Sequence, residues 1–288
     1  MICYTDRIIL VCSGTALCYN VNKSSWRKNK MINTVSISFM FITLLICFVL
    51  PMILILKFNL IYKPKTIFFA VGFILFLFFE RVLRMPFLKV LEDYTWYTEM
   101  TLSPWKFALF VAFTAAFFGE TGKFLIYRVY ARDHMLWANG VALGIGFGSM
   151  EAMIVTGSVY ARQFMFSLML NSGRFGAKDE IFNNYELSNL VSEMQNTASW
   201  VYLIAGAERL FMLFIHMALS LLTMYGAKSG KLRYLAFVIG IHTVIVSSAI
   251  LLTGFNYWPA QIFLCLIAVI SVLFVFNMSK KDHLFKVK

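Results

Sequence analysis

The chain has 288 residues, of which 60% are hydrophobic and only 14% are charged. A water-soluble domain needs more polar surface than this composition supplies, so the sequence predicts a membrane protein surrounded by lipid. The formal net charge is +12, but the basic residues stand in short stretches between long apolar segments. Such a pattern favours loops that face anionic lipid headgroups, and no nucleic-acid partner is expected.

Seven apolar segments are long enough to cross a membrane, because a spanning helix needs roughly 20 residues at about 1.5 Å rise each. The expected segments are 34–56, 66–83, 104–127, 135–158, 198–226, 233–253 and 258–278. The second segment is short and ends at Glu80 and Arg81, and a long polar loop is expected at 159–197. The predicted fold class is therefore all-α, a polytopic membrane bundle of about seven transmembrane helices.

The basic residues predict which ends of the helices face the cytoplasm. They gather after the first, third and fifth segments and at the C-terminus, which the positive-inside rule places on the cytoplasmic side. These residues are Lys57, Lys63, Lys65, Arg128, Arg132, Lys228, Lys231, Arg233, Lys280, Lys281, Lys286 and Lys288. The first helix is therefore expected to begin outside the cell, and residues 279–288 to form a basic cytoplasmic tail.

Residues 1–30 disagree with this orientation, because basic side chains there would draw the same end towards the cytoplasm. These side chains are Lys23, Arg27, Lys28 and Lys30. We therefore expect 1–30 to be a non-native extension or the result of a mis-assigned start, with translation beginning at Met31 and the membrane domain covering 31–278. N-terminal sequencing of the expressed protein tests this expectation, and an intact Met1 terminus would refute it.

Several ionisable side chains fall inside the predicted helices, where charge is costly and usually marks a functional site in the bundle interior. They are Glu120, Lys123, Glu151, Glu208, Arg209, His216 and His242. Counted from the cytoplasmic ends, Glu120, His216 and His242 lie at depths of about 10, 15 and 14 Å, in one layer. Glu151 and Glu208 lie at about 24 and 27 Å, in a second layer. A carboxylate and two imidazoles at one depth suit a metal or activated-water site, and Zn²⁺ is the expected metal.

Each of these residues also has a purely structural interpretation. Glu120 and Lys123 are spaced to form an ion pair within one helix. Glu208 and Arg209 are adjacent and diverge by about 100°, so they are expected to need partners on other helices, which they would join. A single histidine is more often a hydrogen-bonded core residue than a ligand. Ser220 shares the face of His216 and is either its supporting partner or a packing residue.

The glycines of the fourth segment are interpreted as packing residues. Gly144, Gly146 and Gly148 resemble part of a dinucleotide-binding loop, but no strand precedes them and they lie within a spanning segment. Small residues at this position predict close helix approach near Glu151.

Four motifs resemble the YhfC family of bacterial intramembrane metalloproteases, distant relatives of the CAAX prenyl proteases and the bacteriocin-processing membrane enzymes. The resemblance covers about residues 31–278. The motifs are Phe118-Gly119-Glu120-Thr121-Gly122-Lys123-Phe124, Gly146-Phe147-Gly148-Ser149-Met150-Glu151-Ala152, Glu208-Arg209 followed by His216-Met217-Ala218-Leu219-Ser220, and His242. The chain departs from the family pattern at three positions. The family typically has glutamate at the position of Gly119, histidine at that of Phe147 and aspartate at that of Val246.

The resemblance implies hydrolysis of membrane-associated peptides or proteins in the bacterial plasma membrane. It implies that Glu120 polarises water while His216 and His242 hold a metal, Zn²⁺, or the water itself. Glu151 and Glu208 would shape or charge the catalytic cavity, and the supporting residues would be Lys123, Arg209 and Ser220.

Two other functions remain open at this point. The three departures favour an inactive relative that binds membrane peptides or partner proteins through the retained cavity. Intramembrane glutamate and histidine also occur along ion pathways, which would suit a transporter of ions or small solutes. Against the transporter, the chain has no inverted repeat and no matching pair of helices broken by Gly or Pro.

Overall fold

The computed structural model describes residues 2–4, 7–12, 15–20, 31–173 and 185–280. Three short antiparallel strands precede the bundle and pair in chain order: β1 (Ile2–Tyr4), β2 (Arg7–Cys12) and β3 (Thr15–Asn20). In their register, Ile2 lies opposite Ile9 and Arg7 opposite Asn20. From residue 34 onward the regular structure of the described chain is helical, which confirms the predicted all-α membrane bundle.

Six helical runs in the described part of the chain are long and apolar enough to cross a membrane. Three are single α-helices of the second half: α11 (Ser199–Ser229), α12 (Leu232–Phe255) and α13 (Tyr257–Ser279). The fourth is α6 (Pro104–Val129), which begins at a proline that has no amide hydrogen to leave unsatisfied. Two runs contain a π-helical segment: α1 (Thr34–Leu44), η1 (Leu45–Val49), α2 (Leu50–Tyr62), and α7 (Trp137–Glu151), η4 (Ala152–Gly157), α8 (Ser158–Asn171).

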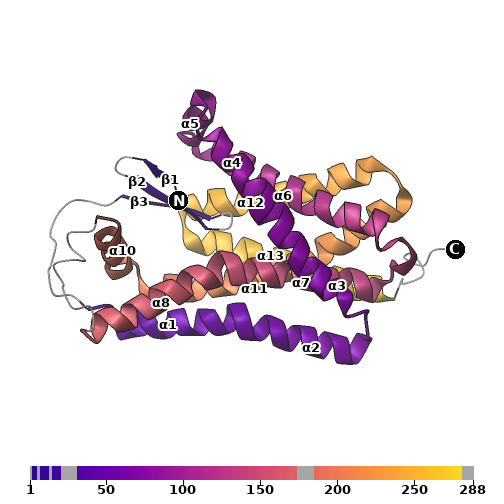
Figure 1. The fold of residues 1–288 in the computed structure, drawn as a ribbon, viewed down its shortest axis with the longest axis horizontal. Helices are drawn as coiled ribbons and strands as arrows, with labels where there is room; N and C mark the ends of the chain where they lie inside the picture. Colours follow the sequence, from indigo (N-terminus) through magenta and orange to yellow (C-terminus); the bar gives the residue numbers. More distant parts are fainter. Residues whose placement is uncertain (1, 5–6, 13–14, 21–30, 174–184, 281–288) are drawn as a thin grey trace.

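A seventh helical run corresponds to the expected second segment but is longer and more charged. It comprises α3 (Ile67–Leu75), the π-helix η2 (Phe76–Arg84) and α4 (Met85–Leu91). The prediction that this helix ends near residue 83 was wrong. The charged residues lie within the π-helix η2, and α4 continues the helix to Leu91. After a short α5 (Thr95–Thr101), the chain enters α6. In Figure 1, α4 and α5 project from one edge of the bundle while α1 and α2 form the opposite edge.

The described residues of the predicted loop at 159–197 are largely helical, and residues 174–184 of that loop lie outside the described part of the chain. The fourth span continues through α8 to Asn171, and α10 (Tyr185–Asn196) precedes α11. Apolar side chains explain this, because Met40, Met194 and Tyr202 form a small buried cluster on which α8 residues such as Phe164 and Leu170 also pack. The remaining element of the described chain is the 3₁₀ turn η3 (Arg132–His134), which links α6 to α7.

α11 occupies the centre of the bundle and packs against α7 on one side and against α6 and α12 on another. Two large apolar clusters meet on it, one containing Leu213 and Leu221 and the other Ile215 and Leu219. The predicted close approach at the glycines of α7 is confirmed. A Cβ on Gly144 would lie 2.7 Å from the Cα of Met217, so only glycine fits there without moving α11.

Candidate active site

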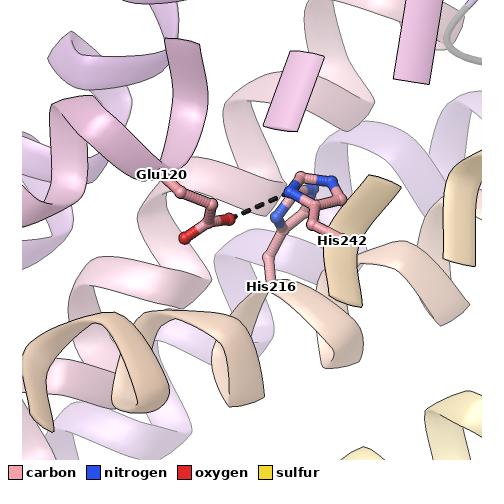
Figure 2. Close-up of side chains that lie close together, drawn as sticks. All are labelled: Glu120, His216 and His242. Atoms are coloured by element: carbon pink, nitrogen blue, oxygen red, sulfur yellow. Dashed lines mark hydrogen bonds and ion pairs between the residues drawn. The ribbon is translucent and has the colours of Figure 1, made fainter. Parts of the chain in front are cut away.

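Glu120 is fully buried in α6 and receives hydrogen bonds on both carboxylate oxygens. Lys123 Nζ lies 2.7 Å from Oε1, His242 Nδ1 lies 3.0 Å from the same Oε1, and the Thr223 hydroxyl donates to Oε2 at 2.6 Å. The ion pair within the helix and the approach to a histidine from α12 were alternative interpretations of the sequence, and the structure contains both. Figure 2 shows the carboxylate directed at the His242 ring.

The two predicted imidazoles converge beside this carboxylate. Glu120, His216 and His242 each place one candidate ligand atom within 4.8 Å of the others, and all three are buried. The two imidazole rings meet edge to face, with centroids 5.3 Å apart. The side chains come from α6, α11 and α12 and point towards one another in Figure 2. The depth layer that the sequence predicted for these residues therefore corresponds to a real cluster.

The second predicted layer is not separate from the first. Glu151, at the end of α7, lies 2.5 Å from His216 through Oε2 and Nε2, and its Oε1 accepts a hydrogen bond from Arg209 at 3.0 Å. Glu208 also contacts Arg209, at 2.7 Å. The expected partner on another helix is present for Arg209, which contacts Glu151 of α7, and the adjacent Glu208 and Arg209 also pair with each other. His216 therefore connects the two groups of charges.

Among the residues discussed here, three carboxylates share two permanent cations. The carboxylates belong to Glu120, Glu151 and Glu208, and the cations to Lys123 and Arg209. The wall of the adjoining cavity adds charged residues of both signs, including Glu80, Arg81 and Arg84. Buried charges of this kind need partners, and the ion pairs provide them.

The hydrogen bonding of the two histidines suits a metal site. Each imidazole uses one nitrogen to contact a carboxylate, His216 with Glu151 and His242 with Glu120. The other His216 nitrogen, Nδ1, is buried and has no hydrogen-bond partner among the described residues. A metal-binding histidine commonly hydrogen-bonds a carboxylate through its second nitrogen, which fixes the ring. The residues present therefore fit a metal ion held by the histidines.

A cavity of about 580 Å³ opens beside the cluster. Its wall includes His216, His242, Glu151 and Glu208, together with Glu80 from η2. Apolar side chains from α6, α12 and α13 line much of the rest. A cavity of this volume falls in the range of small-molecule and peptide side-chain sites.

Two of the departures from the family pattern contact each other. A Cβ on Gly119 would lie 3.2 Å from Cζ of Phe147, so the phenylalanine ring lies over the glycine. The same ring packs against His216 with centroids 5.0 Å apart, and the Lys123 ammonium lies 4.5 Å from its centre. Phe147 therefore separates the ammonium and carboxylate of α6 from part of the cavity.

Among the described residues, Ser220 makes no hydrogen bond to His216. Its hydroxyl donates to the backbone carbonyl of Gly140 at 2.8 Å and lies 2.7 Å from the Tyr127 hydroxyl. Of its two interpretations, the geometry corresponds to the packing residue. Lys123 and Arg209, in contrast, directly contact the predicted acids.

Sequence reasoning missed Glu80, Arg84 and Thr223. Glu80 and Arg84 form a 2.9 Å ion pair one turn apart. Glu80 was expected, with Arg81, at the end of the second helix rather than on a buried face, and Arg84 was not singled out. Thr223 stands seven residues after His216, so helical periodicity places both on one face of α11. That spacing was a usable signal, whereas the burial of Glu80 depends on the path of η2.

Comparison with known proteins agrees with this geometry. The chain is 25% identical over 261 residues to "Uncharacterized membrane protein YhfC" of Bacillus subtilis (strain 168), a match that covers 89% of this chain and 100% of the relative. No solved structure gives a significant match. The model of the YhfC intramembrane metalloprotease family matches residues 46–270, which include every residue of the buried cluster. The chain therefore belongs to the YhfC intramembrane metalloprotease family.

Proposed function

We propose that this protein is a zinc-dependent membrane peptidase that hydrolyses membrane-associated peptides or proteins. The observation that carries the proposal is the convergence of Glu120, His216 and His242, whose candidate ligand atoms lie within 4.8 Å of one another inside the bundle. His216 and His242 would hold the ion, with the Glu120 carboxylate as third donor, since two histidines and one glutamate form a common catalytic zinc site. When bound, Zn²⁺ would supply Lewis-acid polarisation and a lowered pKa of water.

The side chains around the histidines would hold the metal-binding residues in fixed orientations. Glu151 fixes the His216 ring through Nε2, and Arg209 holds the other oxygen of Glu151. Thr223 and Lys123 fix Glu120 in the same way. Because these partners are buried, the acidic and imidazole groups are already oriented before substrate arrives, and little reorganisation is needed during the reaction.

We place the protein in the bacterial plasma membrane with its C-terminus on the cytoplasmic side. Supporting this orientation, the α2–α3 turn, the α11–α12 turn and the C-terminal end of the described chain lie at one end of the bundle (Figure 1). Lys65 and His134 from two neighbouring connections contact each other there at 2.9 Å. Labelling of a cysteine introduced at Lys280 in intact cells and in lysed cells tests the orientation. Reaction only after lysis is expected.

The central experiment measures zinc and cleavage on the same purified protein. Zinc at one ion per chain is expected in detergent solution, with at least about 100-fold weaker binding in His216→Ala and His242→Ala. Reconstituted protein should cleave a library of membrane-inserted peptides, lose this activity with a chelator and regain it with Zn²⁺. Glu99→Gln, on the exposed surface of α5, serves as the matched control and should bind and cleave normally.

A second candidate is a relative that binds membrane peptides without cleaving them. It is favoured by the ion pair that Lys123 already forms with Glu120 and by the Phe147 ring beside Gly119. The same preparation separates the two functions. Stoichiometric zinc with chelator-sensitive cleavage supports the peptidase, whereas absence of zinc, together with peptide binding that Glu120→Gln leaves unchanged, supports the binding protein.

A further inference from the structure

Glu80 differs in its hydrogen bonding from Glu151, a buried acid of the same cavity. Glu151 has a donor on each oxygen, Arg209 on one and His216 on the other. Glu208 accepts a hydrogen bond from Arg209 on Oε1. Glu80 has one donor, Arg84, on Oε2, while its Oε1 has no hydrogen-bond partner among the described residues. The Glu80 side chain is only 10% exposed, and the residue belongs to the cavity wall.

Arg84 explains why the free oxygen is held in one place. Its Nη2 donates to the Val111 carbonyl at 3.0 Å, and its Nε donates to the Thr114 hydroxyl at 3.2 Å. Both acceptors belong to α6, so the guanidinium attaches η2 to α6 and holds Glu80 by Oε2. Glu80 also lies in a π-helix, a rare element that is often found at functional sites.

The free oxygen lies beside the residue that precedes Glu120. A Cβ on Gly119 would be 3.5 Å from Glu80 Oε1, in ordinary contact. The η2 segment therefore brings a carboxylate from another helix to the side of α6 where Gly119 leaves room for it. The same cavity wall contains His216 and His242, so Glu80 shares one cavity with the groups proposed to hold the metal.

We propose that Glu80 is the proton-accepting carboxylate of this cavity. The proposal rests on the proposed peptidase function. Glu80 Oε1 accepts a proton from water as the water oxygen bonds to the carbonyl carbon of the scissile peptide. The proton then passes to the amide nitrogen as the C–N bond breaks, so that an acid and an amine leave and Glu80 returns to its initial state.

The first test does not require peptidase turnover. Dicyclohexylcarbodiimide adds to a buried carboxyl that can take up a proton and attack through a free oxygen, and mass spectrometry of the protein in detergent locates the adduct. Glu80 should be labelled at least tenfold faster than Glu151, whose two oxygens both have hydrogen-bond partners. Equal or faster labelling of Glu151, or no labelling of Glu80, would overturn the proposal.

The second test measures turnover and zinc together. Glu80→Gln should lower kcat by about 100-fold or more while leaving zinc content and elution as a folded monodisperse species unchanged. Adding Gly119→Asp, which places a carboxylate beside residue 80, should raise kcat at least tenfold above that of Glu80→Gln. Full activity in Glu80→Gln, or loss of its zinc, would overturn the role of Glu80 as the proton acceptor.

The two tests separate this proposal from the proposed function. If the unaltered protein binds no zinc and cleaves no peptide, while Glu80 alone is labelled rapidly, the peptidase proposal falls and Glu80 stands as the reactive acid of the cavity. If the protein cleaves peptides in a zinc-dependent way and Glu80→Gln is fully active, the peptidase stands and the assignment of Glu80 falls.

Discussion

The helices at the edge of the bundle differ from those at its centre in both hydropathy and burial. In α1–η1–α2 and in α13, the best 18-residue windows have mean hydropathies of 3.0 and 2.6, and 22% of their residues are buried. In α7–η4–α8 and in α11, the corresponding hydropathies are 1.4 and 1.8, and 72% of the residues are buried. The less apolar helices thus lie inside, where they contact protein.

This difference follows from the solvent around each helix. An edge helix faces lipid, where apolar side chains alone are stable. A central helix can carry charges and glycines, because neighbouring helices provide charged partners and close packing. The acids and bases of the candidate site lie on α6, α7, α11, α12 and η2, and none of them lies on α1–η1–α2 or α13. Substitutions matched between the centre and the edge should therefore have very different effects.

The largest difference is expected for charge. Arg209→Met removes the cation that contacts both Glu151 and Glu208, leaving two buried carboxylates without it, and should lower the free energy of unfolding by about 3–5 kcal/mol. The matched control Lys57→Met, at an exposed position of α2, should change it by no more than about 0.5 kcal/mol. Denaturant titration in detergent micelles measures both. Similar losses in the two variants would contradict the distinction between centre and edge.

A smaller but clear difference is expected for apolar truncation. Leu219→Ala in α11 removes a side chain that is 2% exposed and should cost about 2–5 kcal/mol, because the cavity left behind cannot be filled. Leu266→Ala in α13, where the side chain is 58% exposed, should cost less than about 1 kcal/mol since acyl chains fill the space. The same titration is the measurement, and a Leu266→Ala cost equal to that of Leu219→Ala would show that α13 packs against protein.

Glycine substitutions sharpen the comparison further. Gly144→Ala would place a methyl group 2.7 Å from the Met217 Cα and 2.8 Å from the His216 carbonyl oxygen, so it should cost about 1–3 kcal/mol by forcing α7 from α11. Gly240→Ala, in α12, meets nothing within 4 Å and should stabilise by up to about 1 kcal/mol through its helix propensity. A neutral Gly144→Ala would mean that the two helices separate without loss.

The smallest effect is expected outside the membrane, at Glu193 of α10. Burial raises the pKa of this carboxyl above its ordinary value, so folding favours its protonated form. Stability from this group is therefore present at low pH and is lost as the pH rises through the raised pKa. Glu193→Gln should match the unaltered protein near pH 4 and exceed its Tm by about 2 °C near pH 7. A difference in Tm that does not change with pH would contradict this cause.

Part of the candidate site could be predicted because helical rise is constant. Counting about 1.5 Å per residue from the basic ends placed Glu120, His216 and His242 at one depth, and they do meet. The same counting separated Glu151 from His216, which was wrong because side-chain length and helix tilt join residues that differ in depth. The position of Glu80 was inaccessible to counting, since η2 departs from regular α-helical geometry.

The sequence alone determined that this chain is a membrane protein, where its main spans lie and which acid and imidazoles belong together, because composition and helical rise are properties of the chain itself. Only the tertiary structure decided how each helix is rotated and which helices are neighbours. Those choices bring Glu80 beside Gly119, place Phe147 over the same position and pair Arg209 with two acids. They depend on packing between segments distant in sequence, which residue spacing along one helix does not specify.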